Sequence, residues 1–365
     1  MVDWNLAVAT ATRLVRPGPE VSRDEARAVV AELRRHAKAS EQHVRGFTRM
    51  GTDDIHDTPI LVVDRPGWVR ANVAGFREVL KPLLDKMQER RGNTPGGAVF
   101  GAVGGKVTGV ELGMLLSFLS SRVLGQYETF APASRELPAG AKGGRLLLVA
   151  PNIVHVEREL DVQPHDFRLW VCLHEETHRT QFTAVPWLRD HLEGEIQSFL
   201  GETEVDPMTV LERIREAAQS LAGGRPEGEE DDEGRSLVEI VQTPAQREIL
   251  GRLTAVMSLL EGHADFVMDG VGPDVVPSVA EIREKFQQRR AKGASRLDSA
   301  LRKLLGLDAK LRQYRDGERF VRAVVEQVGM DGFNRVWTSP NTLPTKAEIA
   351  KPADWVTRVH RKAES

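Results

Sequence analysis

Residues 167–182 read FRLWVCLHEETHRTQF and contain neither proline nor glycine. Phe167, Trp170, Val171, His174 and His178 recur at the spacing of one helical face, which predicts an amphipathic helix with both histidines on its inward stripe. Side chains four residues apart lie one turn above each other, so these two imidazoles can bind a single metal ion. This stretch therefore decides both the expected fold and the expected chemistry.

The same stretch contains His174-Glu175-Glu176-Thr177-His178, an H-E-x-x-H motif. In such a site zinc lowers the pKa of a bound water to about 7, and the glutamate after the first histidine can take the water's proton as it attacks a carbonyl. We therefore expect Glu175 to act as the general base. The motif is short, and the competing interpretation is a core helix whose two histidines hydrogen-bond to carboxylates.

The third metal ligand has to come from another segment. The extended motif H-E-x-x-H-x-x-G-x-x-H would need glycine at 181 and histidine at 184, where this chain has Gln181 and Ala184. A downstream helix predicted to run from about Thr243 to Gly270 offers Glu261, four residues before Asp265.

Glu261 would complete a two-histidine, one-glutamate site, and Asp265 would accept a hydrogen bond from the outer nitrogen of a ligand imidazole. Both carboxylates share a face with the apolar stripe Leu250, Leu253, Met257, Ala264 and Met268, where a buried charge needs a cationic or histidine partner. His263 and, less favourably, His191 remain alternative third ligands.

The bulk composition excludes several classes of protein. The 365 residues carry a net charge of -3, which favours neither nucleic acid nor an anionic membrane surface as a partner. Cys172 is the only cysteine, so an internal disulfide and a cysteine-based structural zinc site are excluded. The amino terminus lacks a signal-peptide pattern, and the most apolar stretch, 101–125, is interrupted by charges. We expect a cytoplasmic protein that does not enter a membrane.

The remaining elements are mainly helical. Ser22 and Glu25 form a helix-capping pattern, and residues 145–153 (RLLLVAPNI) read as a strand in the position of a zincin edge strand, which can pair with an extended peptide. The acidic tract 222–236 is expected to be a mobile surface loop. The tail after Trp337 is expected to wrap the protein as an extended cap. These elements predict a mainly helical α+β fold with a small sheet, in which an amino-terminal helical segment (1–95) and a catalytic unit (96–365) form one integrated domain.

A resemblance to a known family agrees with this interpretation. HEETHRTQF (174–182), LLEGHADFVMD (259–269), LLGLDAKLRQYRDGERF (304–320), GFNRVW (332–337) and TLPTKAEI (342–349) are together similar to the Zincin_2 family, formerly a domain of unknown function. The resemblance covers the chain from about residue 60 onward. The family is one of zinc-dependent metallopeptidases, mostly from actinobacteria and relatives, and one branch is described as associated with coenzyme F420 biosynthesis.

The resemblance implies a zincin-like fold with zinc at His174 and His178, Glu175 as base and Glu261 as third ligand. It does not supply a substrate. In gluzincin-type sites a tyrosine often stabilises the oxyanion, and Tyr314 is the candidate here, with a purely structural tyrosine as the alternative. We thus expect a zinc-dependent metallopeptidase acting on a peptide or protein, of open oligomeric state. The alternative is a zinc-binding, non-catalytic or partner-binding protein that retains the fold.

Overall fold

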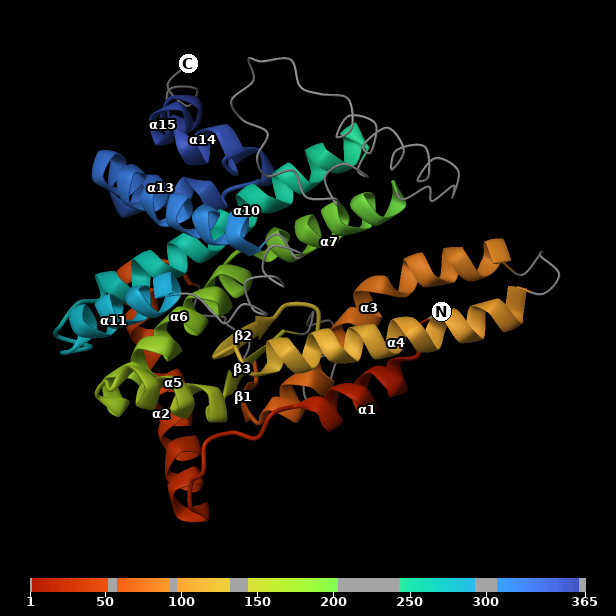
Figure 1. Ribbon diagram of the computed structural model, residues 1–365. Coiled ribbons are helices and arrows are strands. Elements are labelled where there is room, and N and C mark those ends of the chain that lie inside the picture. Colours follow the sequence, from red (N-terminus) through yellow and green to blue (C-terminus); the bar gives the residue numbers. More distant parts are fainter. Residues whose placement is uncertain are drawn as a thin grey trace, which may run out of the picture.

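The computed structural model describes residues 2–51, 58–91, 97–131, 144–202, 243–292 and 307–360. Its architecture is mainly helical with one small sheet, which confirms the predicted α+β class (Figure 1). The acidic tract 222–236 lies outside the described residues. Within the described ranges, no helix combines the length and the apolar character that a membrane span requires.

The elements follow one another along the chain as helices interrupted by three short strands. The amino-terminal half contains α1 (Trp4–Leu14), α2 (Arg23–Thr48), β1 (Ile60–Val63), α3 (Arg65–Arg91), α4 (Gly97–Ser120), β2 (Gly125–Glu128), β3 (Arg145–Val149), α5 (Ala150–Leu160), α6 (Pro164–Ala184) and α7 (Pro186–Gly201). The second half contains α10 (Pro244–Gly270), α11 (Val279–Lys292), α13 (Leu307–Phe333), the 3-10 turns η1 (Asn334–Trp337) and η2 (Pro340–Thr342), α14 (Lys346–Ala350) and α15 (Pro352–His360).

The sheet has the order β1-β3-β2, with β1 parallel and β2 antiparallel to β3. The predicted strand 145–153 is therefore the central strand, and its expected position at the edge was wrong. It also ends earlier than predicted, at Val149, because Pro151 lies in the first turn of α5, where a missing N–H costs nothing. The two edge strands of the sheet are β1 and β2.

Helices cover both faces of the sheet. Figure 1 shows α1, α3 and α4 on one side of it and α2, α5 and α6 on the other. Side chains alternate along β3 accordingly: Leu147 and Val149 pack into the cluster formed by α1, α3 and α4, whereas Leu148 packs into the cluster of α2, α5 and α6. Burial on both faces explains the uninterrupted apolar run of β3.

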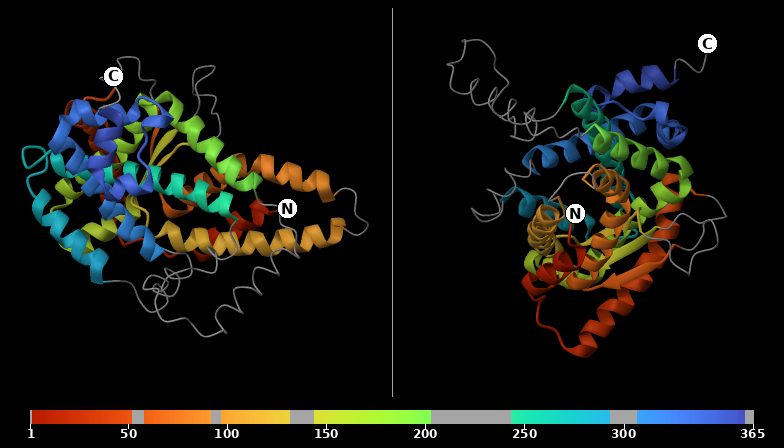
Figure 2. Two further views of the ribbon diagram at one scale, coloured as in Figure 1. Left: turned by 90° about the horizontal axis from the view of Figure 1, so that it is seen from above. Right: turned by 90° about the vertical axis from the view of Figure 1, so that its right-hand side faces the viewer.

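The carboxy-terminal helices form a second layer over α10. The helices α13 and α14 pack on α10, and Figure 2 shows them with α15 at the end of the molecule where the chain terminates. Trp355 and Phe333 are fully buried in this layer. The predicted extended cap was wrong, because Pro340 and Pro352 stand in the first turns of η2 and α15 and thus begin short helices instead of preventing them.

Two helices, α6 and α10, pack against each other at the middle of the molecule. Their starts agree with the sequence: Pro164 opens α6, and Thr243 and Gln246 form a complete capping box at α10. Both helices carry the predicted site residues, so their packing decides where those residues meet.

Candidate metal centre

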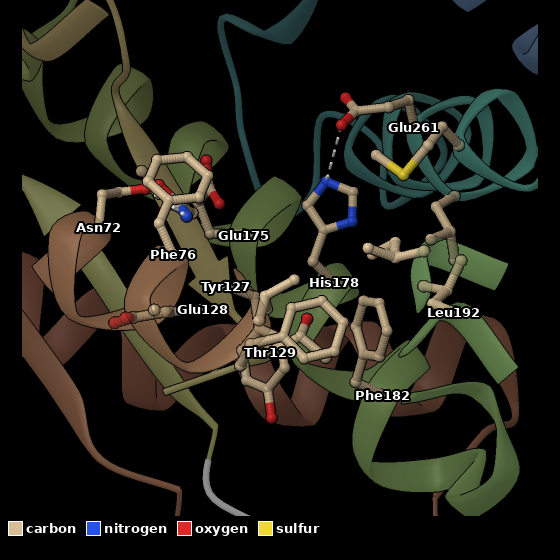
Figure 3. A pocket seen from close by; sticks show the side chains of 18 of the residues that line it. Asn72, Phe76, Tyr127, Glu128, Thr129, Glu175, His178, Phe182, Leu192 and Glu261 are labelled. Atoms are coloured by element: carbon tan, nitrogen blue, oxygen red, sulfur yellow. Dashed lines mark hydrogen bonds and ion pairs between the residues drawn. The ribbon is translucent and has the colours of Figure 1, made fainter. Parts of the chain in front are cut away.

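The packing of α6 on α10 brings His174, His178 and Glu261 together. The Nε2 atoms of the two histidines are 3.3 Å apart, and their rings stand nearly perpendicular, at 87°. The Glu261 carboxylate faces both rings: Oε2 is 3.8 Å from His174 Nε2, and Oε1 is 3.8 Å from His178 Nε2. Figure 3 shows Glu261 reaching from α10 towards the His178 ring.

These three side chains fit a zinc ion. In a tetrahedral site with bond lengths of 2.0–2.2 Å, neighbouring ligand atoms lie about 3.4 Å apart. The two histidine nitrogens already have about this separation, and each carboxylate oxygen lies 3.8 Å from the histidine nitrogen that it faces. Two imidazoles and one carboxylate are also the donor set of catalytic zinc sites, which leave the fourth position open.

The outer nitrogens of both histidines face acceptors that orient the rings. His178 Nδ1 donates to Gln181 Oε1 at 3.0 Å, and His174 Nδ1 lies 3.5 Å from Asp265 Oδ1. With the proton on Nδ1, each Nε2 presents its lone pair to the centre, which is the state that binds a metal. Asp265 thus lies beside the outer nitrogen of a candidate ligand histidine, which is the position expected for it from the sequence.

The alternative ligands lie elsewhere. His263 points away from the centre, fully buried among aromatic rings, and burial lowers its pKa to about 3 with a further contribution from His178. Its Nδ1 accepts a hydrogen bond of 3.0 Å from Gln181 Nε2. His191 lies on α7, with its ring against Trp187. Neither belongs to the ligand cluster that contains Glu261.

Glu175 lies beside the centre but is not one of its ligands. Its side chain is buried in the wall of the pocket that also contains His174, His178 and Glu261. Burial raises the pKa of Glu175 well above the usual range, and the negative charge of Glu261 raises it further. A cation between the ligands would offset this repulsion between the two carboxylates.

The close contact between Glu175 and β2 depends on a glycine. A Cβ atom on Gly125, the first residue of β2, would lie 2.5 Å from Glu175 Cγ and 2.8 Å from its Oε1. Only glycine lets the strand approach the carboxylate this closely. The edge strand and the expected base are therefore in direct contact.

The pocket in front of the centre is mainly apolar and has a volume of about 620 Å³. Its described lining includes three glutamates and neither lysine nor arginine. Figure 3 shows Phe76, Phe182 and Leu192 around the cavity with Tyr127 on the β2 side. Its apolar side chains come from α3, β2 and its following segment, α6, α7 and α10: Phe76, Val79, Phe130, Phe182, Leu192, Ile196, Leu253, Met257 and Leu260.

Some of these features differ from the expectations or could not be anticipated. The stripe expected to face the core on α10 includes Leu253 and Met257, which instead line the pocket. Gly125 and β2 gave no signal in the sequence, whereas Gln181, three residues after His178 on a helix, could have been found from its spacing. The side chain of the oxyanion candidate Tyr314 lies outside the described residues.

The chain is similar to a known protein family and to a solved structure. A family model described as zincin-like metallopeptidase matches residues 2–356, so the match begins well before residue 60. A crystal structure from Chloroflexus aurantiacus, described as a "putative hydrolase with a novel fold", is 29% identical, covers 99% of both chains and superposes with a TM-score of 0.68. No curated protein matches the chain.

Proposed function

The chain belongs to the zincin-like metallopeptidase family, and we propose that it is a zinc-dependent peptidase of the gluzincin type that acts on peptides or proteins. The observation that supports this most strongly is the convergence of His174, His178 and Glu261 beside Glu175 at the wall of an open pocket. A purely structural metal site would need neither an adjacent base nor a cavity of this size.

The three ligands would hold zinc through two neutral imidazoles and one carboxylate. Zinc bound there would supply Lewis-acid chemistry, polarising the scissile carbonyl and lowering the pKa of a water molecule to about 7. Gln181 and Asp265 keep the imidazoles oriented by binding their outer nitrogens. None of these residues transfers a proton, and Glu175 has that role.

Glu175 acts as the general base and then as the general acid. It takes a proton from the attacking water as the new C–O bond forms, and it passes that proton to the amide nitrogen as the C–N bond breaks. The neighbouring Glu176 cannot share this role, because both of its oxygens accept from Arg179 Nε, at 3.0 and 2.8 Å, on the opposite side of α6.

The substrate would lie along β2. This strand is at the edge of the sheet and its residues line the pocket, so an extended peptide can add to it as a further strand. The apolar lining favours a bulky apolar side chain next to the scissile bond, and the described lining offers an acidic one neither lysine nor arginine as a partner.

The first prediction concerns Glu175→Gln. This substitution keeps the size of the side chain and removes its proton-accepting charge, so the zinc content should not change. Hydrolysis of fluorogenic peptides with Phe, Leu or Met at the cleavage position should fall by about 100- to 10,000-fold, as expected for the loss of a general base. The matched control is Glu193→Gln, on the exposed side of α7, which should leave kcat/KM unchanged.

Two results would contradict the proposal. If Glu175→Gln kept wild-type activity, the base would be another group. If the zinc-loaded wild-type protein cleaved no peptide of a broad library, a non-catalytic zinc-binding role would replace the peptidase.

A further inference from the structure

A second group of potential metal ligands lies at the opposite end of α6 from the pocket. Glu32 and His36 are one turn apart on α2, and His165 is in the first turn of α6. Each of the three offers a ligand atom within 4.8 Å of the other two. His165 precedes His174 by nine residues, or roughly 13 Å along the helix, so the two groups are separate.

This group resembles the catalytic one in its donors and in its geometry. Both consist of two histidines and a glutamate. The rings of His36 and His165 are 4.6 Å apart at 87°, compared with 4.8 Å and 87° for His174 and His178. Like His174, which faces Asp265, His165 has a carboxylate next to one ring nitrogen: its Nδ1 is 3.3 Å from Asp166 Oδ1. With Nδ1 engaged in this contact, Nε2 is the ring nitrogen of His165 that could bind a cation.

The acceptor Asp166 is itself fixed. Its other oxygen accepts from the backbone nitrogen and the hydroxyl of Ser278, at 2.9 and 2.7 Å. Carboxylates that are hydrogen-bonded in this way commonly orient the histidine ligands of metal sites. The second group therefore has a supporting acceptor of the same kind as the first.

Glu32 has one oxygen available for a cation. Its Oε2 accepts from Arg168 Nη1, and Arg168 is bound on its other side by both oxygens of Glu157. The charge of Arg168 is thus matched by Glu157, and Glu32 Oε1 lies on the side of His36, 3.4 Å from Nε2.

His36 Nε2 is buried, and its neighbour Glu32 Oε1 lies at 3.4 Å, which is long for a hydrogen bond. The residue is 8% exposed, so a cation between the two atoms would satisfy both. The simplest alternative is an ordinary His36–Glu32 ion pair. That ion pair does not involve His165, whose ring nevertheless lies 4.6 Å from the His36 ring although its side chain is 62% exposed.

We propose that Glu32, His36 and His165 form a second divalent-metal site, selective for zinc or a similar imidazole-binding ion, that links α2 to the start of α6. Two imidazoles and a carboxylate suit such ions, and the exposed His165 side leaves room for water as the remaining ligand. The group does not line the pocket, so the ion would stabilise the helix pair and take no part in hydrolysis.

The test measures zinc per chain by elemental analysis, together with titration calorimetry, on full-length protein. The variants are His36→Ala, His165→Ala, His178→Ala and the His36→Ala/His178→Ala pair. The expected stoichiometries at saturation are two for wild type, one for each single variant and none for the pair. Because His165 is exposed, His165→Ala keeps the test valid even if His36→Ala fails to fold.

The matched control is His155→Ala. His155 is an exposed histidine on α5 whose Nε2 is 3.9 Å from Glu159, in the same i,i+4 arrangement, and it belongs to no three-ligand cluster in the described part of the chain. This variant should retain both ions, whereas His165→Ala should lose the second ion.

The proposal would be overturned if wild-type protein bound a single zinc that was lost only in His178→Ala. A second ion that is retained equally in His36→Ala, His165→Ala and the control would also overturn it. Peptide hydrolysis distinguishes the two sites, because His36→Ala and His165→Ala should keep peptidase activity. If the catalytic site bound no zinc, wild-type protein would bind a single ion, and that ion would be lost in His36→Ala and kept in His178→Ala.

Discussion

At the scale of single residues, the two adjacent glutamates of the motif have opposite surroundings. Glu176 is bound by Arg179 on the same helix, and Arg179 also pairs with Glu41 at 2.8 Å, so the arginine ties α6 to α2. Burial nevertheless raises the pKa of Glu176 to about 7. Glu175, by contrast, has β2 and Glu261 as neighbours and lines the cavity. The motif alone assigns these roles by spacing, and the structure supplies a physical reason for them.

Gly125→Ala tests how closely the edge strand has to approach the base. Its Cβ would lie 2.5 Å from Glu175 Cγ, so the carboxylate or the strand has to shift. Displacements of about 1 Å can cost about 100-fold in rate, and we expect kcat/KM to fall by roughly that factor while zinc is retained. Peptide kinetics and zinc analysis of the same preparation check this result.

The control is Gly194→Ala, at a helical position where a Cβ would meet nothing within 4 Å. This control should keep its activity. Equal activity of Gly125→Ala and wild type would show that the contact with Glu175 is not needed for catalysis.

At the scale of elements, the position of Glu261 depends on a close crossing of two helices. A Cβ on Gly262 would lie 2.1 Å from the carbonyl carbon of Gly317, and one on Gly317 would lie 1.9 Å from the Ser258 oxygen. The backbones of α10 and α13 are thus in contact directly behind the third ligand, and glycine is needed on both sides.

Gly262→Ala should therefore separate α10 from α13. Overpacking of a tight contact typically costs about 1–3 kcal/mol, so we expect a loss of about 2 kcal/mol in the free energy of unfolding and weaker zinc binding. Denaturant unfolding and zinc titration measure the two effects.

Gly251→Ala, on the same helix, has open space around its Cβ and should be neutral or stabilising by up to about 1 kcal/mol. If the two variants were equally stable, the crossing would not position α10.

The elements also show what the sequence could and could not predict. The start of α6 at Pro164 and the capping box of α10 follow from local chemistry, and both are confirmed. The central position of β3 depends on which strands pair with it, and β1 and β2 are only four residues long. Such strands give little periodic signal, so neither they nor the edge of the sheet could be predicted.

At the scale of the whole molecule, the site joins residues that lie far apart in the chain. Glu261 was predicted because a carboxylate on an apolar face needs a partner, which is a physical constraint visible in the sequence. The pocket could not be predicted, because its walls come from segments as distant as Phe76 and Leu260. The assignment of His174, His178 and Glu261 as zinc ligands stays a prediction, now with a geometry that suits it.

The fully buried His263 makes the stability of the molecule depend on pH. Its folded-state pKa of about 3 lies below the unfolded value, because burial and the nearby His178 disfavour the imidazolium. A lowered folded-state pKa stabilises the protein above about pH 6.5, and this contribution is lost as the pH falls towards 3. Acid should therefore weaken the layer formed by Phe333 and Trp337, which contact the ring.

His263→Asn removes this titration and keeps an acceptor for Gln181. We expect the variant to be less stable than wild type at pH 7, because it loses ring packing. This deficit should shrink by about 1–2 kcal/mol at pH 5, since only wild type loses stability through His263. Denaturant unfolding of chelator-treated protein at both pH values measures the change. A deficit that stays constant with pH would contradict the assignment of a buried neutral imidazole.

The central claim, a zinc ion held by α6 and α10, is tested most directly by anomalous diffraction at the zinc absorption edge, using crystals of zinc-loaded protein. The account predicts a peak about 2 Å from His174 Nε2, His178 Nε2 and a Glu261 oxygen, with a fourth position open to the pocket. Absence of a peak between these side chains, or a fourth position filled by another protein side chain, would contradict it.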